Sequence, residues 1–157
     1  MKLTRKQRTK QFANKLKNIV LPVIAYGGVA GIVVGFVVSL FNLGATYLSE
    51  YSNIIYKWMG ENPAYIPLLF VGLIALALIM ALLHKFVPQV RGSGIPQTEG
   101  VLRGLVTFKW LRILISTIVG SYISFFAGLS LGAEGPSVQI GATTAQGVSQ
   151  ANLLRIA

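Results

Sequence analysis

Residues 128–141 read GLSLGAEGPSVQIG and place a carboxylate among glycines, just before a proline. Glu134 is one of only four acidic residues in a chain of 157. Proline is favoured in the first turn of a helix, so Pro136 indicates that a helix begins here. An ionisable group among apolar neighbours is costly and usually marks a path for ions or protons. This stretch therefore predicts that a helix begins near Pro136 and carries a functional carboxylate.

The composition around this stretch is that of a membrane protein, with 54% hydrophobic and 11% charged residues. Three apolar segments have about the 20 residues that a helix needs to cross a bilayer. They cover residues 19–43, 65–83 and 111–131. We therefore expect an all-α, multi-pass integral membrane protein.

The net charge of +10 follows the pattern of a membrane topology. Seven of the 14 basic residues lie in the first 17 positions, directly before the first apolar segment. This pattern predicts a cytoplasmic N-terminus, with residues 1–18 as a basic tail or interfacial helix, and argues against a nucleic-acid partner. The first apolar run is too long for the core of a cleaved signal peptide.

The connections between the apolar segments agree with this orientation. Residues 44–64 are predicted to form an external loop. The next connection is expected on the cytoplasmic side because it is rich in basic side chains. These are His84, Lys85, Arg91, Arg103, Lys109 and Arg112. His84 is expected to mark the membrane boundary.

The chain lacks the usual groups of an enzyme site. It has no cysteine and no aspartate, and His84 is its single histidine. Hydrolytic and metal-dependent chemistry would therefore lack the customary partners, so we expect no enzyme, no metal and no cofactor.

A second glycine–proline loop occurs at residues 91–100, which read RGSGIPQTEG. Pro96 predicts the start of a short helix, and the flanking glycines favour a re-entrant half-helix. In both loops a glycine precedes the proline by four residues: Gly92 before Pro96, and Gly132 before Pro136. Each helix start offers unpaired N–H donors and about half a positive charge. Two such starts aimed at one point would bind an anion.

Two side chains would act within this anion site. Ser93 would add a hydroxyl donor, and ionised Glu134 would compete with the anion for the helix N-terminus until protonation releases it. For each residue the alternative is an ordinary helix-capping role. Small residues spaced every four positions predict close helix packing. They are Gly27, Gly31 and Gly35 in the first segment, and Ser116, Gly120, Ser124 and Gly128 in the third.

These loops closely resemble the CLC family of voltage-gated chloride channels and proton-coupled chloride antiporters. The family's G-S-G-I-P signature is intact at residues 92–96, and its G-R-E-G-P signature appears as GAEGP at 132–136. The resemblance covers about residues 19–150 and implies a CLC-type bundle of tilted, partly re-entrant helices over residues 19–157. It also implies a chloride site and selectivity filter formed by Gly92, Ser93, Gly94, Ile95, Pro96, Gly132, Ala133, Glu134, Gly135 and Pro136. Glu134 would be the gating and proton-exchanging glutamate.

Two departures from the family pattern stand out. Ala133 replaces the usual arginine, which leaves the field near Glu134 less positive. The later filter loop, pore tyrosine and internal proton-transfer glutamate of the family would lie beyond Ala157, so we expect an incomplete bundle. The expected function is chloride transport as part of a channel or an H+/Cl− antiporter, with chloride, protons and the bilayer as partners. The complete protein is expected to be a homodimer in the plasma membrane. The alternative is a truncated, non-transporting membrane fragment or interaction module.

Overall fold

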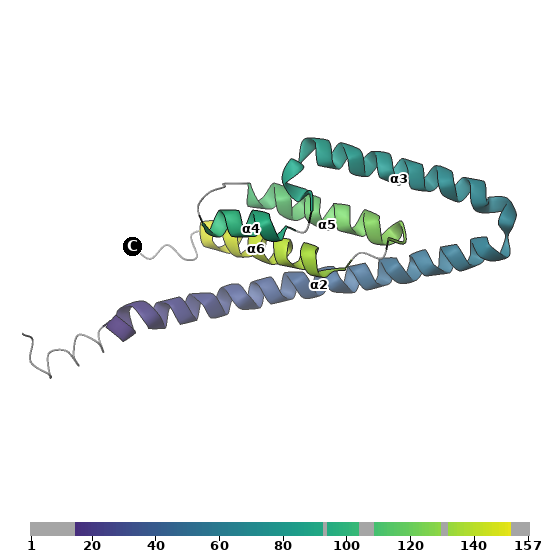
Figure 1. Cartoon of the computed structure of the whole chain (residues 1–157). Helices are drawn as coiled ribbons and strands as arrows, with labels where there is room; N and C mark the ends of the chain where they lie inside the picture. The colour runs from purple at the N-terminus through teal and green to yellow at the C-terminus, as the bar shows by residue number, and fades with distance from the viewer. Residues whose placement is uncertain (1–14, 93, 104–108, 130–131, 152–157) are drawn as a thin grey trace, which may run out of the picture.

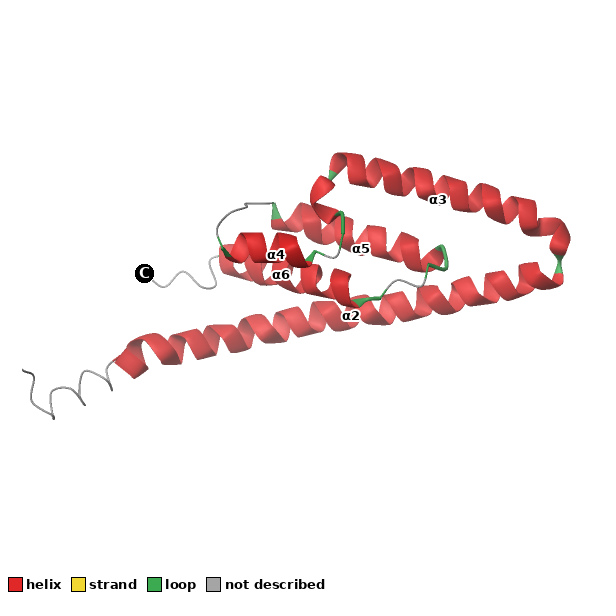
Figure 2. Ribbon diagram, in the orientation of Figure 1, coloured by secondary structure: helices red, strands yellow, loops and turns green. Residues whose placement is uncertain are grey.

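The computed structural model describes residues 15–92, 94–103, 109–129 and 132–151, and Figures 1 and 2 show its helices. The elements are a short π-helix η1 (Leu16–Val20), α2 (Leu21–Glu61), η2 (Pro63–Tyr65), α3 (Ile66–Phe86), η3 (Pro88–Val90), α4 (Ile95–Leu102), α5 (Trp110–Phe126) and α6 (Glu134–Gln150). These residues contain no strand, so the predicted all-helical class is confirmed. Most of the predicted basic tail, residues 1–18, lies outside the described residues.

Helices α2, α5 and α6 pack against one another and form the centre of the bundle. The short α4 packs beside α6, and α3 lies against α5 (Figure 1). The buried centre consists of Phe41, Ala45, Phe125 and Ile140. Tyr122 of α5 stacks on Phe41 with a ring-centre separation of 5.4 Å, and its hydroxyl donates to the Phe41 carbonyl at 3.3 Å.

Gly44 of α2 has no side chain, and this leaves space for the ring of Tyr122 from α5. A Cβ at Gly44 would lie 2.8 Å from the Tyr122 Cζ and would overlap the hydroxyl. We expect Gly44→Val to destabilise the protein by about 1–3 kcal/mol, the usual cost of overpacking. Thermal unfolding in detergent would measure the loss. Gly28→Val is the control because a Cβ at Gly28, on the same helix, meets nothing within 4 Å. Equal melting temperatures for the two variants would contradict this packing.

The predicted external loop at residues 44–64 is wrong, because α2 continues through it to Glu61. Residues 45–59 contain neither glycine nor proline, and Ala45 and Ser52 are buried seven positions apart on one helical face. The chain leaves the helix only at Asn62, before Pro63. With 41 residues, α2 is about 60 Å long, which is about twice the thickness of a bilayer core.

Two of the three predicted spans correspond to helical segments that are long and apolar enough to cross a membrane. These segments are Lys17–Glu61 and Pro63–Phe86. The third predicted span, residues 111–131, is longer than the helix found there. Helix α5 has 17 residues, which corresponds to a length of about 26 Å. The chain turns just after Phe126, where Gly128 has a φ of +74° and Tyr56 donates to the Ala127 carbonyl at 2.7 Å.

Two arginines hold the C-terminal end of α3. Arg112 of α5 donates to the Phe86 carbonyl at 2.9 Å, and Arg91 donates to the His84 carbonyl at 3.3 Å. The last carbonyls of a helix lack partners within the helix and carry partial negative charge, so cations at this end are stabilising. Through these two hydrogen bonds, the basic residues that follow α3 in the sequence contact its C-terminal end.

The small-residue positions behave differently in the two helices. Gly120 of α5 is buried, and a Cβ there would lie 3.0 Å from the Leu83 side chain of α3. Close packing is therefore confirmed for this part of α5. At Gly27, Gly31 and Gly35 a Cβ would meet nothing within 4 Å among the described residues, so their packing role stays a prediction.

Candidate functional site

Helix α4 begins at the first glycine–proline loop, one residue before Pro96. Gly94 is its N-cap residue, with a φ of +74°, and its carbonyl accepts from the Thr98 amide at 3.0 Å. Gly94 is also buried, and a Cβ added at this position would lie only 2.6 Å from the Gln139 Cβ. Both the left-handed backbone and the close approach require glycine at this position. Ser93 lies outside the described residues.

Helix α6 begins at the second loop, two residues before Pro136. Ala133 is the N-cap residue and makes no side-chain cap bond, while Glu134 occupies the first turn. Glu134 therefore lies where its negative charge interacts favourably with the helix dipole. The N-cap position, which the alternative interpretation gave to Glu134, is occupied by Ala133.

The side chain of Glu134 is exposed in the described part of the chain, although its neighbours in sequence are mostly apolar. The apolar residues that follow it, Val138 and Ile140, lie in the second turn of α6. Burial on α6 begins only at Gln139 and Ile140.

Gln139 joins the elements that carry the two loops. Its side chain is 3% exposed, accepts from Thr117 Oγ1 of α5 at 3.0 Å, and donates from Nε2 to the Gln89 carbonyl of η3 at 3.0 Å. Its Cβ is also the atom that approaches Gly94. The sequence analysis assigned no role to this residue. The available signal was a glutamine five positions after Glu134, in a helix whose next residue is apolar.

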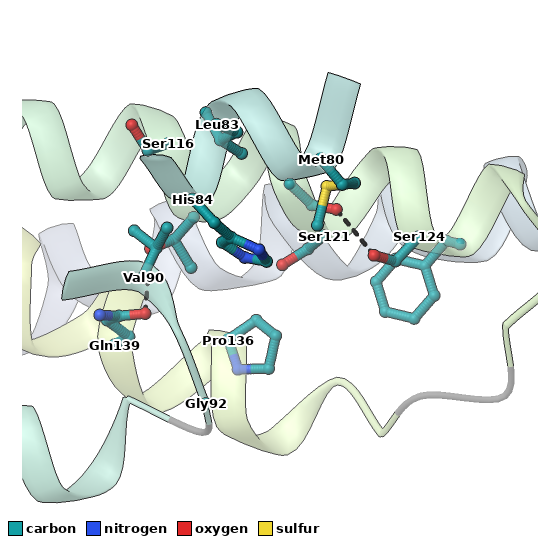
Figure 3. Close-up of a pocket in the computed structure, with 13 residues that line it drawn as sticks. Met80, Leu83, His84, Val90, Gly92, Ser116, Ser121, Ser124, Pro136 and Gln139 are labelled. Atoms are coloured by element: carbon teal, nitrogen blue, oxygen red, sulfur yellow. Dashed lines mark hydrogen bonds between the residues drawn. The ribbon is translucent and has the colours of Figure 1, made fainter. Parts of the chain in front are cut away.

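Residues from both loops line one cavity of about 200 Å³ between α3, α5 and α6 (Figure 3). Gly92 reaches it from the first loop and Pro136 from the first turn of α6. Its α5 wall carries hydroxyl groups, and the rest of its lining is mainly apolar. The hydroxyl residues are Ser116, Thr117, Ser121 and Ser124.

The structure brings together only part of the predicted site. Gly92 and Pro136 share the cavity, and Gly94 contacts Gln139 behind it. The other predicted and described residues do not line this cavity. They are Ile95, Pro96, Gly132, Ala133, Glu134 and Gly135. Ala133 instead packs against the buried centre that contains Phe41.

The remaining acidic group of the first loop belongs to the helix surface. Glu99 forms an ion pair at 2.6 Å with Arg103, the residue that caps the C-terminal end of α4, and both side chains are exposed. Such pairs contribute little to stability. Within residues 15–92, 94–103, 109–129 and 132–151, no three His, Asp or Glu side chains gather as a metal would require.

Comparison with known proteins gives a consistent family relationship. The family model described as "Voltage gated chloride channel" matches residues 71–156. The H+/Cl− exchange transporter ClcA of Vibrio parahaemolyticus is 32% identical over 124 residues, which is 76% of this chain and 26% of that protein. ClcA of Citrobacter koseri is 34% identical over 126 residues, 77% of this chain and 26% of that protein. ClcA of Salmonella arizonae is 43% identical over 76 residues, 48% of this chain and 16% of that protein.

The chain thus spans about a quarter of the length of the curated relatives that match most of it. No solved structure matches the chain.

Proposed function

Because the chain belongs to the voltage gated chloride channel family, we propose that it forms part of a pathway that carries chloride across a membrane. The observation that carries this proposal is the meeting of the two glycine–proline loops. Gly92 and Pro136 line one cavity, and Gly94 packs on the helix that Glu134 begins. The start of α4 therefore contacts the second turn of α6, and residues from both loops line one cavity.

The chemistry of these helix starts suits a mobile anion. Their first N–H groups carry partial positive charge, which binds an anion without the strong attraction of a fixed cation. Ser93 would add its hydroxyl to the same site. The predicted filter would consist of residues 92–96 and 132–136, with the anion between their backbone N–H groups.

Glu134 is proposed as the gate of this site. Its carboxylate begins α6 and is exposed, so in the ionised form it competes with chloride for the same N–H donors. Protonation removes the negative charge and with it the competition. Chloride access should therefore increase as the pH falls.

Proton exchange is the form of transport that we propose first. The relatives reported above are named as H+/Cl− exchange transporters. A carboxylate that alternates between binding a proton and occupying an anion site links the two substrates directly. A channel of the same family is the alternative, and it would retain the gating role of Glu134 without net proton movement.

The proposed membrane arrangement follows from the helices and the basic residues. Segments Lys17–Glu61 and Pro63–Phe86 would cross the bilayer in opposite directions, starting from a cytoplasmic N-terminus. The end of α3, where Arg91 and Arg112 bind its carbonyls, would then return to the cytoplasmic side. We also propose a homodimer in the plasma membrane, with a separate pathway in each subunit.

Chloride efflux from vesicles tests the proposed function. The native protein that contains this chain would be reconstituted into vesicles loaded with chloride, and release would be followed with a chloride electrode. We expect rapid release of chloride and little release of sulfate from matched vesicles. Equal release from protein-free vesicles would refute chloride transport.

A further inference from the structure

We infer that His84 and Ser121 form a small-anion site in the cavity of about 200 Å³, and that this site binds its anion when His84 is protonated. The inference deepens the proposed function, on which it rests for the choice of a chloride-like occupant. Both side chains line the cavity. In Figure 3 the imidazole of His84 points into it, and the Ser121 hydroxyl is drawn among the residues that line the same cavity.

Two of the other hydroxyl groups that line the cavity already donate hydrogen bonds. Thr117 donates to Gln139, and Ser124 donates to the Gly120 carbonyl at 3.0 Å. The His84 and Ser121 side chains, by contrast, make no hydrogen bond with any other described residue. A protonated imidazole has two N–H donors and a serine has one O–H donor. These donors, together with the Ser116 hydroxyl, are available to an anion in the cavity.

Among the described residues that line this cavity, His84 is also the only one with an acidic or basic side chain. It lies on the last turn of α3, and its ring is half-buried. Histidine is the side chain that ordinarily changes its charge between about pH 5 and pH 8. A cavity lined by a histidine can therefore carry a positive charge, unlike a site built only from hydroxyls and helix ends.

The charges around His84 favour an anion as its partner. Arg91 donates to its carbonyl, and Arg112 of α5 donates to the Phe86 carbonyl. An anion in the cavity would attract both these cations and a protonated imidazole, so a proton and an anion should bind together rather than independently.

The described acidic and phenolic groups nearby do not neutralise His84. Glu99 of α4 is paired with Arg103, and Glu134 of α6 is exposed and does not line the cavity. Tyr56 of α2, which lines an adjoining apolar cavity with His84, donates to the Ala127 carbonyl. The described residues thus give protonated His84 no carboxylate partner.

The size of the cavity limits the occupant to a small ion. Water occupies about 30 Å³ per molecule in the liquid, so the cavity can hold a halide with a few waters. The mostly apolar remainder of the lining would strengthen the attraction between an imidazolium and a bound anion. A monovalent inorganic anion is the ligand class that fits these properties.

Bromide binding to the native protein in detergent tests the inference, with isothermal titration calorimetry at about pH 5.5 and about pH 8. We expect the wild type to bind bromide about tenfold more tightly at the lower pH. His84→Gln should remove this pH dependence, and Ser121→Ala should weaken binding at the lower pH. Lys85→Gln, which removes a neighbouring exposed cation, is the control and should keep the wild-type pH dependence.

His84→Arg gives a second test that does not depend on losing a signal. A permanent cation should bind bromide tightly at both pH values. Unchanged pH dependence in both His84 variants would overturn the inference, as would equal loss of binding in Lys85→Gln. This outcome can be distinguished from that of the chloride efflux experiment. Bromide binding that depends on His84, without chloride efflux, would refute only the proposed transport. Chloride efflux without His84-dependent bromide binding would refute only this anion site.

Discussion

Glu134→Gln is expected to abolish the pH dependence of chloride flux in the native protein that contains this chain. The amide has nearly the same shape as the carboxylate but carries no charge, so it cannot compete as an anion for the helix N-terminus. The wild type should transport chloride about tenfold faster at about pH 4.5 than at about pH 7.5, whereas the variant should be fast at both. Chloride efflux from vesicles at the two pH values measures this difference.

Glu99→Gln is the matched control for Glu134→Gln. Glu99 is also an exposed glutamate on a helix that begins at a glycine–proline loop, but it forms an ion pair with Arg103 on the helix surface. Its replacement should leave the pH dependence as in the wild type. If Glu134→Gln kept the wild-type pH profile, Glu134 would not be the gate.

Gly94→Val is expected to remove chloride transport and to destabilise the bundle. Valine would have to adopt a φ of +74°, which costs a residue other than glycine about 1–3 kcal/mol. Its Cβ would also lie 2.6 Å from the Gln139 Cβ, and such overpacking costs about 1–3 kcal/mol more. To relieve this overlap α4 would have to move away from α6, and this movement would separate the two glycine–proline loops. Thermal unfolding in detergent and vesicle efflux would measure both effects.

Gly72→Val is the control for this substitution. Gly72 lies within α3, and a Cβ there meets nothing within 4 Å among the described residues. The Gly72→Val protein should have the melting temperature and the chloride flux of the wild type. A Gly94→Val protein with wild-type stability and flux would show that contact between Gly94 and Gln139 does not hold the site together.

The local features of the site could be predicted from sequence because they depend on neighbouring residues. Pro96 and Pro136 each marked a helix start to within two residues, and the glycine before each proline identified the loops. Gly44 shows where such reasoning fails. Glycine and polar residues suggested a loop, whereas α2 continues and uses the missing side chain to accommodate Tyr122.

The long-range features of the site could not be predicted in this way. The role of Gln139 depends on Gly94, Thr117 and Gln89, which come from separate parts of the chain. The exposure of Glu134 likewise depends on how the first turn of α6 lies in the bundle, and apolar neighbours in sequence do not determine it. His84 was expected only to mark the membrane boundary, because its contact with a cavity requires the packing of α3 on α5.

Locating bromide in crystals tests the shared anion site most directly. Crystals of the native protein that contains this chain would be grown in bromide, and the anomalous signal would locate the ion. We expect a bromide within hydrogen-bonding distance of the backbone N–H groups at the starts of both α4 and α6. In Glu134→Gln a further bromide should occupy the position that the carboxylate has left. Bromide bound elsewhere, with none at either helix start in either protein, would contradict the proposal that these two loops form a chloride pathway.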